Sequence, residues 1–229
     1  MTDLTALMIA CAAFVGTHFL LSHPLRASII GRIGERPFLG LYSLVALATF
    51  AAVVVTYRAT APAAFLWSVG DGIWGVASAW MWCASVLLAG SFRGNPALPD
   101  PAALTHANQP AQGVFAITRH PMMWSFILWA VSHIAVLPTA PNLILSGAIL
   151  FLAFFGALGQ DRRKIRAMGI DWQGWQGRTA FLPFGMQLTG KAAWSDAVPS
   201  PFVLAAGTLL WLGATWLHGA VGAGIWRWL

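Results

Sequence analysis

The sequence predicts an all-α protein, a polytopic membrane helical bundle with about six transmembrane helices and its N-terminus outside. Of its 229 residues, 58% are hydrophobic and only 9% are charged, and the mean hydropathy is +0.70. Soluble domains carry about 25% charged residues. The composition therefore excludes a soluble globular enzyme, a disordered chain and a disulfide scaffold. We treat residues 1–229 as a single transmembrane domain.

The apolar runs are long and free of charges, which is typical of helices and not of the alternating strands of a barrel. A helix needs about 20 apolar residues to cross about 30 Å of hydrocarbon. Pro24 ends the first run and Pro138 ends the fourth, because proline cannot continue a helix. The fourth run is short, so either it begins earlier or the loop before it dips inward. The predicted spans are 4–23, 38–57, 73–91, 122–137, 142–159 and 202–218.

The basic residues alternate with these spans. Eleven of the 13 Lys and Arg residues follow the first, third or fifth span, and only Arg58 and Arg227 lie on the other side. Basic residues in short loops stay in the cytoplasm, so both termini are expected outside. The basic residues follow the first span instead of preceding it, which predicts a retained anchor and not a cleaved signal. Basic loops beside anionic lipid account for the net charge of +6, so membrane lipid is the expected partner and nucleic acid is not.

Two histidines lie inside predicted spans, His18 in the first and His133 in the fourth. Ionisable groups in lipid are costly and mark functional sites. Each histidine could make a hydrogen bond between helices or bind a haem iron axially. No Cys-x-x-Cys-His motif occurs, which excludes a covalently attached haem. His23 and His218 lie at the ends of spans and are expected at the membrane interface, and His106 lies in a loop.

Further polar groups gather at the cytoplasmic side. Pro121 suits the first turn of the fourth span, which places Arg119 and His120 at its mouth. Because helix N-termini attract anions, these residues could bind a carboxylate or phosphate, such as a haem propionate or a nucleotide-like cofactor. The alternative is a charged cap that faces lipid headgroups. Asp161 opens a basic cluster after the fifth span. The aromatic segment 171–184 is expected to lie along the membrane face.

The loop 95–112, between the third and fourth spans, is expected to be a surface excursion without chemistry.

Short motifs occur in a fixed order along the chain. They are Gly16-Thr17-His18, Ser22-His23-Pro24-Leu25-Arg26, Gly34-Glu35-Arg36-Pro37-Phe38, Tyr42-Ser43, Ile117 to Trp124, Leu128-Trp129, Ser132-His133 and Trp175 to Phe184. In this order and spacing they resemble the NnrU family of bacterial membrane proteins, and the resemblance covers nearly the whole chain. It implies a bacterial inner membrane location and an association with denitrification and nitric oxide metabolism.

The NnrU family is similar to the plant and cyanobacterial zeta-carotene cis-isomerases, which hold a b-type haem and use its redox state for isomerisation. This similarity implies haem b as cofactor and His18 and His133 as its axial metal ligands. The isomerases have a cysteine three residues before the second ligand, where this chain has Ala130. Ligand switching by a thiolate is therefore not expected here. At about 1.5 Å per residue, the two histidines differ in depth by about 10 Å or more, which makes His133 with His218 an alternative pair.

Two other functions stay open. Arg119, His120 and Asp161 resemble the pattern of the isoprenylcysteine carboxyl methyltransferases, which bind S-adenosylmethionine at the cytoplasmic face. That pattern has a Glu pair where this chain has Gln160-Asp161. The third possibility is a non-catalytic membrane protein that assists nitrogen-oxide enzymes as a partner.

Overall fold

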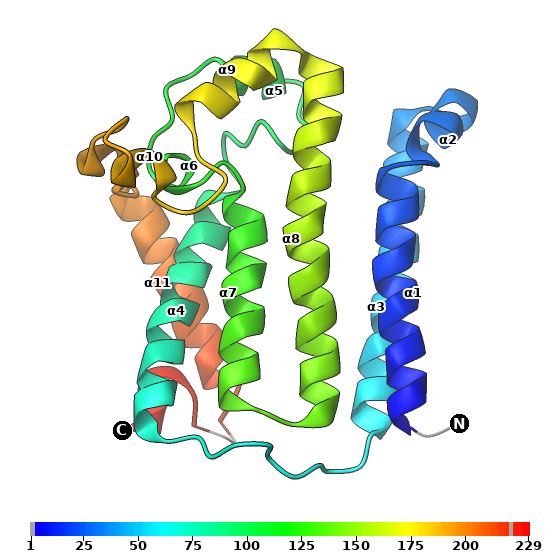
Figure 1. Ribbon diagram of the computed structural model, residues 1–229, viewed down its shortest axis with the longest axis vertical. Helices are drawn as coiled ribbons and strands as arrows, with labels where there is room; N and C mark the ends of the chain where they lie inside the picture. Colours follow the sequence, from blue (N-terminus) through cyan, green and yellow to red (C-terminus); the bar gives the residue numbers. More distant parts are fainter. Residues whose placement is uncertain (1–2, 220–221) are drawn as a thin grey trace.

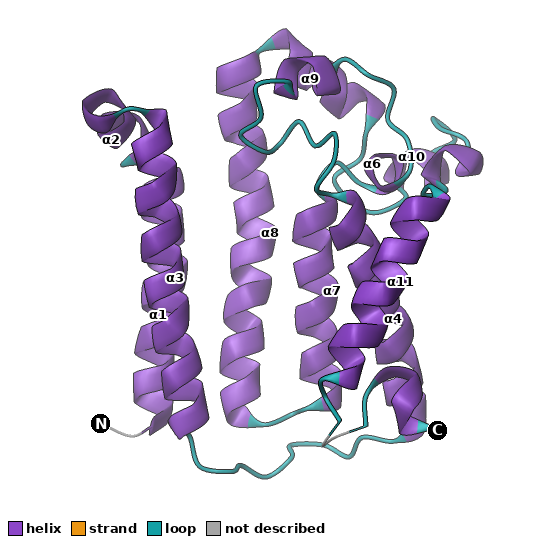
Figure 2. Ribbon diagram, turned by 180° about the vertical axis from the view of Figure 1, so that it is seen from behind, coloured by secondary structure: helices purple, strands orange, loops and turns teal. Residues whose placement is uncertain are grey.

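The computed structural model describes residues 3–219 and 222–229, and all the regular secondary structure in these ranges is helical (Figure 2). The all-α prediction is confirmed, and each predicted span falls on a helix. Four helices are long and apolar enough to cross a membrane (α1, α3, α4 and α8), while α7 and α11 are shorter apolar helices. Their bounds are α1 Asp3–Ser22, α3 Glu35–Ala59, α4 Asp71–Gly90, α7 Pro121–Val136, α8 Ala140–Met168 and α11 Pro201–Trp216.

The six apolar helices pack in a row, in the order α3, α1, α8, α7, α4 and α11. In Figure 1 the pair α1 and α3 stands on one side of α8, and α7, α4 and α11 stand on the other. Both ends of the chain lie at the same end of the bundle, opposite α2 and α9 (Figure 1). We call the end that carries α2 and α9 the basic end.

Short helices cover the basic end. They lie in the connections between the long helices there. A last 3₁₀ turn, η2, packs against α4 and α11 at the opposite end. The short elements are α2 Arg26–Ile33, α5 Ala103–Ala107, α6 Val114–Ile117, α9 Ile170–Arg178, α10 Gly185–Leu188, η1 Trp194–Ala197 and η2 Gly224–Arg227.

The structure corrects the predicted end of the fifth span. The α8 helix continues from residue 159 to Met168, through the whole basic cluster. Lys, Arg, Gln and Met are good helix formers, so charge alone does not end a helix. The helix ends at Gly169, whose φ of 55° places it in the left-handed region that favours glycine.

The structure also corrects the expectation for the aromatic segment 171–184. Trp172 and Trp175 of α9 are 0% and 2% exposed, and they pack in one cluster with Phe115. Tryptophan is enriched both at membrane interfaces and in protein cores. Here α9 packs against α5, and its two indoles are buried in protein.

A second apolar cluster joins the two parts of the row. Leu7, Cys11 and Phe14 of α1 pack with Val53 of α3 and against residues 144–152 of α8. These contacts lie towards the ends of α1 and α8 that are farther from the basic end. Nearer the basic end α1 and α8 leave space between them, and the candidate site lies there.

Candidate functional site

A cavity of about 690 Å³ lies between the α1/α3 pair and α7/α8. Its volume is in the range of sites for small molecules and cofactors. The walls are largely apolar and aromatic, while the polar residues gather towards the basic end. Apolar wall residues include Phe14, Leu39, Phe50, Phe126, Ile149 and Leu152.

His18 lines this cavity, and its ring is held in place by its neighbours. Its Nδ1 lies 2.7 Å from the carbonyl oxygen of Phe14, so Nδ1–H donates to that carbonyl. The ring also packs against Phe14 and, edge-on, against Tyr42 at a centroid distance of 5.5 Å. A backbone acceptor at Nδ1 fixes the tautomer and leaves the Nε2 lone pair free, as in histidines that bind metals.

His133 lies elsewhere. The described residues that line the cavity do not include it. It is twelve residues along α7 from the basic end, whereas His18 is four residues from that end of α1. At about 1.5 Å per residue, their depths differ by about 12 Å. The structure therefore does not bring the two predicted axial ligands together.

His133 instead lies next to His218, the other histidine near the end of the bundle opposite the basic end. It stacks on Trp129 at 4.0 Å, and its ring centroid is 6.3 Å from that of His218. Its Nδ1 donates to the Trp129 carbonyl oxygen at 2.8 Å, so its Nε2 is also left free. A role for His133 as an iron ligand stays a prediction.

Three cationic side chains lie at the basic end of the cavity: Arg26, Arg163 and Lys164. Arg26 forms an ion pair with Glu35 at 3.2 Å. Arg163 Nη1 donates to the Ser22 carbonyl oxygen at 3.4 Å. Lys164 Nζ donates to two more carbonyl oxygens, those of residues 96 and 98, at 2.6 and 3.3 Å.

His23 also lines the basic end, although the sequence predicted only an interfacial position for it. Partial burial lowers its pKa, and the neighbouring charges of Arg163, Arg166 and Arg162 lower that pKa further. The lowered pKa favours the neutral imidazole. The positive charge at this end of the cavity comes from the arginines and the lysine.

The loop after α4 contributes more than the sequence suggested. Asn95 and Ala97 are buried, and Ala97, Leu98 and Pro99 line the cavity. The Ala97 carbonyl oxygen accepts a hydrogen bond from the side chain of Gln160 at 3.2 Å. This part of segment 95–112 therefore forms one wall of the cavity, and the expectation of a surface excursion is wrong here.

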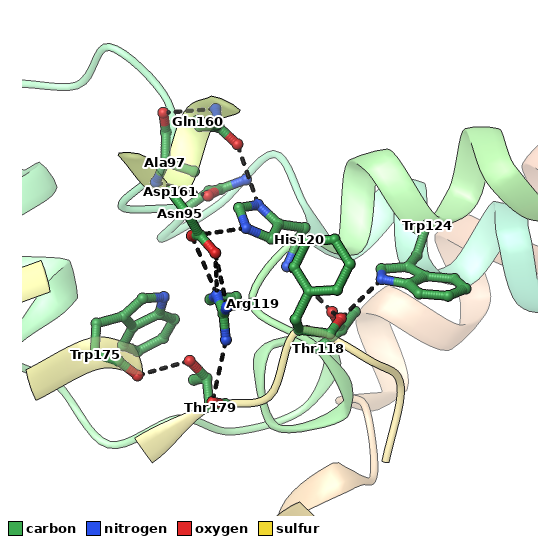
Figure 3. Close-up of polar contacts among 11 residues, drawn as sticks. Asn95, Ala97, Thr118, Arg119, His120, Trp124, Gln160, Asp161, Trp175 and Thr179 are labelled. Carbon is green, nitrogen blue, oxygen red and sulfur yellow. Dashed lines mark hydrogen bonds and ion pairs between the residues drawn. The ribbon is translucent and has the colours of Figure 1, made fainter. Parts of the chain in front are cut away.

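Next to the cavity, Arg119 and His120 converge on Asp161 (Figure 3). Arg119 donates from Nε and Nη2 to Asp161 Oδ2 at 2.9 and 2.7 Å. His120 Nε2 lies 2.9 Å from Asp161 Oδ1, and its Nδ1 lies 3.2 Å from Gln160 Oε1. The three side chains are 13%, 0% and 9% exposed for Arg119, His120 and Asp161. The anionic partner of Arg119 and His120 is thus the chain's own Asp161 carboxylate.

Segment 179–181 closes the cluster from the other side. The Phe181 carbonyl oxygen accepts from Trp124 Nε1 at 2.8 Å and from Thr118 Oγ1 at 2.7 Å. The Phe181 ring lies 5.5 Å from the Arg119 guanidinium and 5.5 Å from the His120 ring. The sequence placed Arg119, His120 and Asp161 at one membrane face, but it did not indicate this aromatic cover.

Comparison with known proteins decides the family. The family described as NnrU protein matches residues 6–224. The chain belongs to the NnrU family. The chloroplastic 15-cis-zeta-carotene isomerases of Arabidopsis thaliana and Zea mays are each 30% identical to this NnrU protein over 111 residues. That match covers 46% of this chain and 30% of each isomerase. No solved structure matches.

Proposed function

We propose that this NnrU protein holds a b-type haem in the cavity between α1/α3 and α7/α8, with His18 as an axial ligand. The observation that carries the proposal is the hydrogen bond from His18 Nδ1 to the Phe14 carbonyl oxygen, which leaves Nε2 free in a residue that lines the cavity. Neutral histidine is a common axial ligand of haem iron. The similarity of part of the chain to the zeta-carotene isomerases supports isomerase-like chemistry at this site.

The residues that line the cavity fit a haem. Aromatic and aliphatic walls suit an apolar macrocycle, and cations lie at one end of the cavity, where two propionates would need them. A bound haem would supply a redox-active iron. We propose that the protein with bound haem carries out isomerase-like chemistry on an apolar substrate and is linked to nitric oxide metabolism.

The contacts of Arg119, His120 and Asp161 do not favour the methyltransferase alternative. These three side chains bond to one another and are buried, and the space next to His120 is about 10 Å³. That volume is about the size of one water molecule. We therefore assign the cluster a structural role.

The test of the haem proposal is the absorption spectrum of protein purified in detergent from haem-replete cells. The wild-type protein should show a Soret band, and His18→Ala should abolish it or shift it strongly. His106→Ala is the matched control, because His106 lies on α5 and does not line the cavity. Haem-free wild-type protein, or an unchanged band in His18→Ala, would contradict the proposal.

His133→Ala tests the second predicted ligand in the same assay. Loss of the band in this variant would mean that α7 and α1 rearrange around the haem, since the structure holds the two histidines apart in depth. An unchanged band would show that His133 is not an iron ligand. The loss or shift of the Soret band in His18→Ala is the positive control.

We further propose that all six apolar helices span the bacterial inner membrane, with the basic end in the cytoplasm and both termini outside. Single cysteines at Arg166 and Ala64, in a Cys11→Ala/Cys83→Ala background, test this orientation because both positions are exposed and lie at opposite ends of the bundle. A membrane-impermeant maleimide added to spheroplasts should label position 64 and not position 166. The reverse pattern would overturn the orientation.

A further inference from the structure

We infer that the basic end of the cavity binds the anionic group of an amphipathic ligand, a carboxylate or a phosphate, through Arg163 and Lys164. The inference deepens the proposed function, because haem propionates are carboxylates of this kind. An acidic lipid would present the same chemistry. Sequence reasoning placed such an anion at Arg119 and His120, but Asp161 already fills that position.

The first argument is charge balance. Glu35 is the only carboxylate among the described residues that line the cavity, and it pairs with Arg26. Within residues 3–219 and 222–229, no carboxylate oxygen lies within 4 Å of the side-chain nitrogens of Arg163 or Lys164. These two cations therefore line a largely apolar cavity, with backbone carbonyl oxygens as hydrogen-bond partners and, for Lys164, the Trp172 ring at 5.9 Å.

The second argument comes from the neighbouring cations on the same helix. Arg162 and Arg166 are exposed, as expected for charges that only set the orientation of the chain. Arg163 and Lys164 are half-buried and line the cavity instead. Orientation does not require charges turned inward, and burying an unpaired charge costs free energy. A bound anion offsets that cost.

The third argument is that the two cations are held in place. The carbonyl oxygens of residues 96 and 98 fix Lys164, and the Ser22 carbonyl oxygen holds Arg163. Groups fixed before binding lose less conformational freedom when the ligand arrives. Ser22 lies one helical turn, about 6 Å, from His18 along the same face of α1. One ligand could therefore reach both His18 and the cations.

The test compares charged ligands with their neutral esters, on the full-length protein in detergent. The first pair is haem and haem dimethyl ester, and the second is a fluorescent long-chain fatty acid and its methyl ester. Wild-type protein should bind the acid form at least about tenfold more tightly than the ester, as expected for charge-assisted hydrogen bonds. Arg163→Gln/Lys164→Gln should remove this preference.

Arg162→Gln/Arg166→Gln is the matched control, because it removes two charges from the same helix and should keep the preference. If Arg163→Gln/Lys164→Gln cannot be purified, the single variants Arg163→Gln and Lys164→Gln are measured in its place. A preference for the free acid in the haem pair assigns the site to propionates, and a preference in the fatty acid pair alone assigns it to a lipid carboxylate.

The outcomes separate this inference from the haem proposal. If haem does not bind but the fatty acid is preferred over its ester, the haem proposal fails and the anion site stands. If haem binds and neither pair is discriminated, the haem proposal stands and the anion site is overturned. A preference that survives in Arg163→Gln/Lys164→Gln would overturn the assignment to these two residues.

Discussion

Replacing Asp161 with asparagine is expected to lower the free energy of unfolding by about 3–5 kcal/mol, the cost of breaking a buried ion pair from one side. The Asp161 carboxylate accepts from Arg119 Nε on both oxygens and from Nη2 on Oδ2, and its Oδ1 also lies 2.9 Å from His120 Nε2. Without this negative charge, the Arg119 guanidinium stays in a site where its side chain is only 13% exposed. The change keeps the shape of the residue and removes its charge.

The measurement is thermal unfolding in detergent, followed by circular dichroism or intrinsic tryptophan fluorescence. Glu35→Gln is the matched control, because Glu35 also pairs with an arginine but is 61% exposed. Exposed pairs contribute about 0–1 kcal/mol, so this variant should unfold close to the wild type. Equal, small effects in both variants would show that the cluster at Asp161 does not stabilise the fold.

The Asp161 cluster also shows what the sequence could predict and what it could not. Pro121 and the apolar run after it were sufficient to place Arg119 and His120 at the mouth of a helix. Asp161 was not predicted as the partner of these two side chains, because the charged residues that begin there suggested that the fifth span ended at residue 159. The helix in fact continues, so Asp161 lies on its inner face and is buried.

The two histidines show a second limit. Long apolar runs predict helices, and the depth of His18 and His133 follows from the rise per residue. Which helices are neighbours does not follow, because helices that are apolar on most faces carry little periodic signal for a packing side. Here α8 lies between α1 and α7 and contacts both. His18 and His133 lie at different depths, as the rise per residue had indicated, and His133 is not among the described residues that line the cavity.

The burial of the aromatic segment 171–184 was not predicted, for a different reason. Trp172 and Trp175 fit the composition of a membrane interface and of a protein core equally well. The difference lies in the contacts of α9 with α5, two elements about 65 residues apart in the chain. Contacts over such separations cannot be read from the composition of one segment. The same holds for the wall that Ala97 and Leu98 contribute to the cavity.

Replacing Gly207 with leucine is expected to be the second most damaging change, at about 3 kcal/mol, the upper end of the cost of overpacking. A Cβ atom on residue 207 of α11 would lie 2.6 Å from Cα and 2.9 Å from the backbone nitrogen of Val86 on α4. These are backbone atoms in a helix, so they cannot rotate away as a side chain can. The two helices must separate, since close approach through small residues holds membrane helices together.

Separation of α11 from α4 would also break a hydrogen bond between them, in which Trp82 Nε1 donates to Thr208 Oγ1 at 3.0 Å. Unfolding in detergent should therefore begin at a lower temperature in Gly207→Leu, with an early change in tryptophan fluorescence. Gly213→Leu is the control on the same helix, because a Cβ there would meet nothing within 4 Å. Leucine is the better helix former, so that variant should be at least as stable as the wild type. Equal losses in the two variants would show that the added bulk of leucine, and not the contact with Val86, determines the effect.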